Sequence, residues 1–190
     1  MSVEMVETAI DRAGVVLRGV SSDQYGLDTP CRSWRVRDLI NHMVAATHWF
    51  AESVDSGVAP EGDDDVSVDV TGGDVLAAYA DGSKRAIAAF SERGVMDKTV
   101  KLPFGDVPCS AFAKFAAMDQ YVHAWDLAKA TEQPTDVMPE FAEEMLVFCR
   151  RAVTDDMRGP EGVALFRPEV AISNNASAPD RLAAYLGRTP

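Results

Sequence analysis

The chain has 190 residues, of which 47% are hydrophobic and 25% charged, and its formal net charge at pH 7 is −12. These values are ordinary for a soluble globular protein and suit a single domain over residues 1–190 with a core of useful size. The negative charge and the lack of a lysine and arginine stripe argue against binding to nucleic acid or to an anionic membrane.

Apolar residues recur at spacings of three and four along most of the chain, which predicts amphipathic helices. A loop interrupts them at Thr29-Pro30, because the residue before a proline disfavours helix, and Ser33 suits the cap of the helix that follows. Residues 56–73 lack a helical period and predict a long exposed loop, whose acidic run lacks the alternating ligands of a calcium site. Helices are predicted in this half over residues 3–18, 34–54 and 74–93.

The second half of the chain begins with an extended segment. Residues 99–105 alternate polar and apolar side chains, and Pro103 confines this segment to a sheet edge or a turn. Three further helices are predicted over residues 110–130, 139–157 and 179–186. Four long helices with little strand predict an all-α fold, an up-and-down-type four-helix bundle with extended loops and a short C-terminal helix.

The sequence has no recognisable targeting segment. Its first eleven residues, MSVEMVETAID, lack the basic and apolar regions of a signal peptide, and no run of about 18 apolar residues occurs. Cys31, Cys109 and Cys149 are odd in number and widely spaced, which suits reduced thiols better than a disulfide framework or a zinc motif. We therefore expect a cytoplasmic protein with no membrane partner.

The predicted helix over residues 110–130 carries an unusual polar group. On a helical wheel His123 lies about 40° to one side of Asp119, and Asp126 about 20° to the other, so all three share one face. That face is otherwise apolar, and an apolar stripe is what a helix turns toward its core. Buried charges need a partner, which is a cation, a set of hydrogen-bond donors or a bound metal.

A second histidine, His42, lies at the shoulder of the apolar arc of the helix predicted over residues 34–54. With Asp119 and His123 it would make a set of two histidines and one carboxylate, which holds Zn²⁺, Ni²⁺, Fe²⁺ or Mn²⁺ with positions left open. Asp126 is predicted to fix an imidazole tautomer or to take a proton. In the alternative, His123 and Asp126 form a local pair, Asp119 meets an arginine, and His42 is an ordinary core histidine.

Several short motifs occur in a fixed order. They are Thr29-Pro30-Cys31-x-x-Trp34, Arg37-Asp38-Leu39-x-x-His42, Leu102-Pro103-Phe104-Gly105, His123-Ala124-Trp125-Asp126-Leu127-Ala128 and Ala178-Pro179-Asp180-Arg181-Leu182-x-x-Tyr185-Leu186-Gly187-Arg188. Together they resemble the DinB-like metal-binding superfamily, and most of all its actinobacterial branch with the N-terminal domain of mycothiol-dependent maleylpyruvate isomerase. The resemblance spans nearly the whole chain.

The resemblance implies a four-helix bundle with a divalent metal held by His42, Asp119 and His123. One position departs from the pattern, because the isomerase has glutamate where this chain has Asp119, a side chain shorter by one methylene. The chain also lacks a long additional C-terminal domain like that of the isomerase, so we do not expect the substrate to be inherited with the fold.

The family implies a thiol cofactor, and a divalent metal can deprotonate a bound thiol whose ordinary pKa is about 8.5. We predict a metal-dependent S-transferase or isomerase that activates mycothiol or a similar thiol against a small electrophile. The alternatives are a non-catalytic binding module of the same fold and a metal-dependent hydrolase with Asp126 as its base. The oligomeric state is left open, and a homodimer is one possibility.

Three bulky residues, Trp34, Trp49 and Phe104, are candidate walls of a substrate pocket. Cys31 is better explained as a buried loop cysteine than as a nucleophile.

Overall fold

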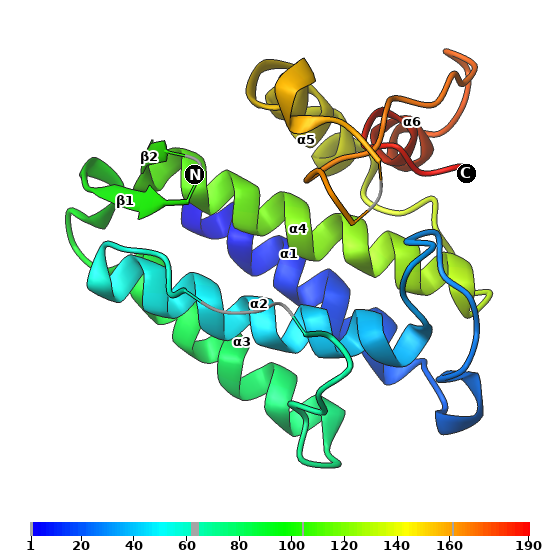
Figure 1. Ribbon diagram of the computed structural model, residues 1–190, viewed down its shortest axis with the longest axis horizontal. Coiled ribbons are helices and arrows are strands. Elements are labelled where there is room, and N and C mark those ends of the chain that lie inside the picture. The colour runs from blue at the N-terminus through cyan, green and yellow to red at the C-terminus, as the bar shows by residue number, and fades with distance from the viewer. Residues whose placement is uncertain (1, 62–64, 104, 161) are drawn as a thin grey trace. The chain divides into compact units, whose positions relative to one another are not determined.

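The computed structural model describes residues 2–61, 65–103, 105–160 and 162–190, and it is mostly helical (Figure 1). The predicted all-α fold class is confirmed. The helices are α1 (Ser2–Arg18), α2 (Val36–Ser56), α3 (Val75–Ser91), α4 (Cys109–Ala130), α5 (Pro139–Ala152) and α6 (Ala178–Tyr185). Within these described ranges, three short 3-10 helices also occur: η1 (Ser22–Gln24), η2 (Val95–Asp97) and η3 (Asp155–Met157).

The predicted extended segment forms half of a small antiparallel sheet. Strand β1 (Thr99–Leu102) pairs with β2 (Gly105–Pro108), with Val100 opposite Val107. Phe104, and residues 62–64 of the predicted acidic loop, lie outside the described residues. Among the helices described, none is both long enough and apolar enough to cross a membrane.

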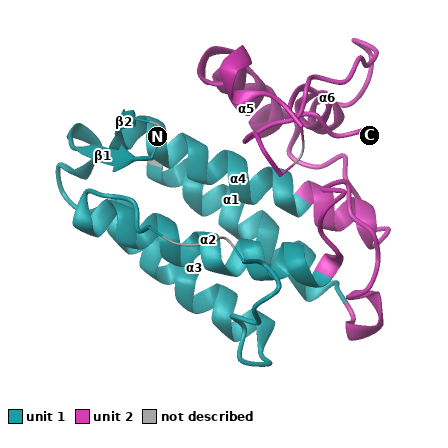
Figure 2. Ribbon diagram, viewed as in Figure 1, with its two compact units in different colours: residues 1–20, 37–124 teal, residues 21–36, 125–190 magenta. Residues whose placement is uncertain are grey.

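The chain divides into two compact units, which Figure 2 shows in different colours. Unit 1 consists of residues 1–20 and 37–124, and unit 2 of residues 21–36 and 125–190. Nearly all of α2 and the first part of α4 belong to unit 1, together with α1, α3 and the sheet. The single domain over residues 1–190 stays a prediction.

The core of unit 1 is built from side chains of several helices. Phe50 on α2, Phe90 on α3 and Phe112 on α4 form an aromatic cluster, with ring centroids 5.4 Å apart for Phe50 and Phe112 and 6.0 Å for Phe90 and Phe112. Trp49 joins this cluster, with its ring 5.6 Å from that of Phe112. Such edge and tilted ring contacts add to the stability that apolar burial supplies.

Unit 2 is held together by polar contacts as well as by apolar packing. The Tyr185 hydroxyl on α6 donates to the backbone oxygens of Cys149 at 3.3 Å and Val153 at 3.4 Å, which joins α6 to α5. The Arg158 guanidinium lies 4.5 Å from the centre of the Tyr185 ring and donates to the Tyr185 backbone oxygen at 2.9 Å. At the start of α6, Ser177 accepts a hydrogen bond from the Asp180 amide and caps the helix.

Three predicted details differ from the structure. The helix predicted over 139–157 ends at Ala152, because the β-branched Val153 and Thr154 are extended. The second helix begins at Val36 instead of residue 34, because a closed loop precedes it: the Thr29 hydroxyl lies 2.9 Å from the Trp34 oxygen. In the helix predicted over residues 74–93, apolar spacing alone would place Leu76 on the buried face, but this residue is 44% exposed. The buried face of α3 instead includes Gly82 and Ser83, which hydropathy does not mark as apolar.

Candidate metal centre

Helix α4 is buried around nearly its whole circumference in the part that carries the candidate residues. Residues 116–118 and 120–128 are all buried, so the expected single apolar stripe is only part of the buried surface of this helix. Polar side chains on this part of α4 therefore stand inside the protein. Each of them needs a partner, and the partners differ from one residue to the next.

The structure brings together the three side chains that the sequence predicts as ligands, all of them in unit 1. His42 on α2 has its Nε2 atom 3.3 Å from Oδ1 of Asp119, and His123 has its Nε2 atom 3.5 Å from the same oxygen. The two imidazole rings lie edge to face, with their centroids 4.6 Å apart. All three side chains are largely buried, with 11–20% of each exposed.

These distances fit a divalent ion. Each residue offers a ligand atom, and the three atoms lie within 4.8 Å of one another. Ligands about 2.0–2.1 Å from one tetrahedral ion lie about 3.3 Å from each other, close to the two separations found here. The same distances also suit hydrogen bonds between a carboxylate and two imidazoles, so geometry allows both states.

The charge of Asp119 also suits a cation. Burial would raise the pKa of this carboxyl group, but the two neighbouring imidazoles and the hydrogen bonds from His42 and Gln120 outweigh burial and hold the pKa below its usual value. Asp119 is thus an ionised oxygen donor at neutral pH. An anionic oxygen beside two imidazole nitrogens is a donor set that binds first-row divalent metals.

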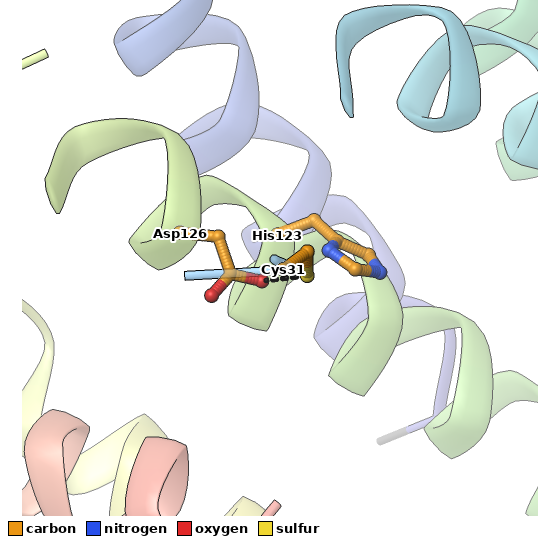
Figure 3. A group of neighbouring side chains, drawn as sticks. All are labelled: Cys31, His123 and Asp126. Atoms are coloured by element: carbon orange, nitrogen blue, oxygen red, sulfur yellow. Dashed lines mark hydrogen bonds between the residues drawn. The ribbon is translucent and has the colours of Figure 1, made fainter. Parts of the chain in front are cut away.

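Asp126 has different surroundings, although it lies on the same helix. Its carboxylate is fully buried in unit 2 and receives hydrogen bonds from Arg188, at 2.9 Å from Nη2 to Oδ2 and 3.2 Å from Nε to Oδ1. The Cys31 thiol donates to the same carboxylate at 3.2 Å (Figure 3). Arginine therefore pairs with Asp126, and not with Asp119 as in the alternative drawn from the sequence.

The described residues that were considered as pocket walls or as a nucleophile lie outside the histidine-carboxylate group. Trp49 packs in the aromatic cluster of unit 1, Trp34 is half-buried, and Phe104 lies outside the described residues. Cys31 was expected to be buried but is half-buried. Its thiol contacts Asp126 and lies 3.4 Å from Nη2 of Arg188.

Sequence reasoning missed two polar residues next to Asp119. Gln120 is 1% exposed and donates through Nε2 to Oδ2 of Asp119 at 3.1 Å. Tyr79 on α3 donates its hydroxyl proton to Oε1 of Gln120 at 2.7 Å. The available signal was a glutamine inside a long apolar helix, but a single glutamine is common on helix surfaces and does not stand out.

Comparison with known protein families assigns most of the chain to one family. A family model described as the mycothiol maleylpyruvate isomerase N-terminal domain matches residues 6–128, a range that contains all four candidate site residues. The chain belongs to this family.

The chain is also similar to two sequences and to one solved structure. Two uncharacterized proteins from two strains of Mycobacterium tuberculosis are each 35% identical to it over 187 residues, which cover 96% of this chain and 95% of theirs. The crystal structure of the mycothiol-dependent maleylpyruvate isomerase is similar in fold, with a TM-score of 0.60 at 15% identity. That match covers 76% of this chain and 66% of the isomerase chain, just under two thirds of its length.

Proposed function

We propose that this protein binds one divalent metal through His42, Asp119 and His123, and uses it with a mycothiol-type thiol to transfer or isomerise a small electrophilic substrate. The observation that carries the metal site is the convergence of two Nε2 atoms on one oxygen of an ionised carboxylate inside unit 1. Membership of the isomerase family supports the thiol and the small-molecule substrate.

The chemistry divides between the ion and the chain. When bound, a divalent ion supplies the positive charge that lowers the pKa of a thiol, so that a thiolate exists at neutral pH. His42 and His123 would each offer Nε2, and Asp119 would offer Oδ1, leaving further positions open for the thiol or the substrate. Partial burial of these side chains limits competing water and strengthens the charge interactions among them.

For Asp126 we propose a positioning role in place of the proton acceptor that the sequence suggested. The Arg188 guanidinium donates to both oxygens of the Asp126 carboxylate, so this charge is already paired with a fixed cation inside the protein. Its bond from Cys31 holds the loop that precedes α2. The proposed role is therefore to fix that loop.

Metal content tests the ligand assignment. The protein has three histidines, so His48 on α2 provides a matched control: its Nδ1 atom lies 3.3 Å from a guanidinium nitrogen of Arg85, and it takes no part in the cluster. We expect purified wild type and His48→Ala to carry about one divalent ion per chain, and His42→Ala and His123→Ala to lose it, because each loses a ligand. The measurement is elemental analysis by mass spectrometry after dialysis. Retention of the ion in both ligand variants would refute the site.

Catalysis needs a separate test, because similarity at 15% identity shows the fold and not the activity. The metal-loaded protein is incubated with a small thiol and a model electrophile, and adduct formation is followed by mass spectrometry. We expect a rate that rises with metal and falls with chelator. If the protein binds metal but forms adduct no faster than the background rate with any thiol, the catalytic proposal is wrong. The alternative function, a non-catalytic binding module of the same fold, would then hold.

A further inference from the structure

The candidate carboxylate ligand has two oxygens, and the structure gives them different partners. Oδ1 of Asp119 faces both imidazoles, whereas Oδ2 accepts a hydrogen bond from the side-chain amide of Gln120 at 3.1 Å. Gln120 follows Asp119 on α4 and is almost completely buried, with 1% of its surface exposed. The amide is therefore part of the interior and not a solvent contact.

The orientation of the Gln120 amide follows from its neighbours. Its nitrogen lies near two groups that can only accept a hydrogen bond, the Asp119 carboxylate and the Met43 backbone oxygen at 3.4 Å. The NH₂ group must therefore point toward them, and the amide oxygen is left to accept a hydrogen bond from the Tyr79 hydroxyl, with 2.7 Å between the two oxygens. Burial raises the pKa of Tyr79 above its ordinary value, so the phenol stays protonated and can donate this hydrogen bond.

An aspartate cannot fix this arrangement by its own torsions. The last torsion of an aspartate side chain is broad and roughly two-fold, so a carboxylate turns easily unless a partner holds it. A turned carboxylate could present both oxygens, or neither, to the imidazole side. The amide hydrogen bond to Oδ2 removes that freedom.

We propose that Gln120, itself held by Tyr79, is a positioning residue that locks Asp119 so that Oδ1 alone faces the two histidines. This inference rests on the proposed metal site. It explains why a buried polar chain runs from α3 through Gln120 to Asp119, where apolar packing would have been simpler. It also predicts that Asp119 binds the ion through one oxygen.

Co²⁺ provides the test, because its visible absorption reports coordination geometry independently of catalysis. We compare wild type with Gln120→Leu, which removes the amide at similar volume, and with Tyr79→Phe, which removes only the hydroxyl. Tyr185→Phe is the matched control, since it deletes the hydroxyl of another buried, hydrogen-bonded tyrosine, which lies in unit 2. Circular dichroism establishes that each variant is folded.

Loss of such a supporting hydrogen bond typically weakens metal affinity by about 10 to 100-fold. We expect this loss for Gln120→Leu in a chelator competition titration, together with a changed Co²⁺ spectrum, and a smaller loss for Tyr79→Phe. Tyr185→Phe should match wild type in both. If Gln120→Leu binds Co²⁺ with wild-type affinity and spectrum while His42→Ala does not bind it, the inference is wrong but the metal site stands. If wild type binds no metal, both are wrong.

Discussion

Asp119 and Asp126 illustrate how the surroundings of a side chain decide its chemistry. Both are carboxylates on α4, but Asp119 lies against two imidazoles and an amide, and Asp126 lies against a guanidinium and a thiol. Imidazole nitrogens and an ionised oxygen together can bind a cation, whereas a guanidinium already neutralises its carboxylate. The proposed metal site is therefore built around Asp119 alone.

The buried thiol of Cys149 should make stability depend on pH in alkaline solution. Burial raises the pKa of this thiol from an ordinary 9.0 to about 12, although the nearby Arg158 opposes the shift. Because the folded-state pKa is raised, this contribution to stability is complete below pH 9.0 and is lost as the pH rises toward 12.

The measurement is urea unfolding of wild type and Cys149→Ala at pH 8 and pH 10. The unfolded wild type releases a proton that the folded chain keeps, so between these pH values its free energy of unfolding should fall by about 1 kcal/mol more than that of the variant. Equal falls in the two proteins would show that the folded thiol titrates normally. Other alkaline titrations are common to both proteins and cancel.

Helices α2 and α3 approach each other closely at a glycine. A Cβ atom on Gly82 would lie 2.0 Å from Oγ1 of Thr47 and 2.9 Å from Nε2 of His48, both on α2. Thr47 is 1% exposed, and its hydroxyl is bound to the Val44 backbone oxygen at 2.7 Å, so it has little room to move. The absence of a side chain at Gly82 is what lets α3 approach α2 this closely beside Thr47 and His48.

Two glycine-to-alanine changes should therefore have opposite effects. Gly82→Ala should lower the free energy of unfolding by about 1–3 kcal/mol, because the added methyl group overpacks the contact with α2. Gly14→Ala on α1 should raise it by up to about 1 kcal/mol, because alanine favours helix. At Gly14 the nearest atoms would be at ordinary contact distances of 3.7 and 3.9 Å.

Chemical denaturation of both variants beside wild type tests this contrast. The two changes are chemically identical and both lie in helices of unit 1, so each serves as the control for the other. A stabilised Gly82→Ala protein would mean that α2 and α3 are farther apart than described.

One buried ion pair connects distant parts of the sequence within unit 2. Arg188, close to the end of the described chain, reaches Asp126 across 62 residues, and the two side chains are 11% and 0% exposed. Arg167 adds a second such tie by donating to the Pro30 backbone oxygen at 3.0 Å. These contacts join the loop before α2 and the last turns of α4 to the C-terminal part of the chain.

Removing the guanidinium should destabilise the protein strongly. We expect Arg188→Ala to lower the free energy of unfolding by about 3–5 kcal/mol, because it leaves a buried carboxylate without its charged partner. The control is Arg35→Ala, which breaks an ion pair between Arg35 and Asp28. The side chains of this pair are 58% and 86% exposed, so the free energy of unfolding should fall by only about 0–1 kcal/mol. Similar small losses in both would indicate that water reaches Asp126.

The sequence was informative where local periodicity carries the information. Helix positions follow from apolar spacing, and Asp119 and His123 share a face because they are four residues apart. His42 could be added because facing helices of a bundle direct their shoulder positions toward each other, and the structure does bring it within 3.3 Å of Asp119. The roles of these residues stay a prediction until metal binding is measured.

The tertiary structure alone could decide which partner each buried polar group meets. His42 and Asp119 are 77 residues apart, Tyr79 and Gln120 are 41 apart, and Asp126 and Arg188 are 62 apart. Helical periodicity says which side chains share a face of one helix, but it does not say which atoms of another segment oppose that face. That choice depends on how the segments pack, because a buried polar group is stable only beside a complementary one.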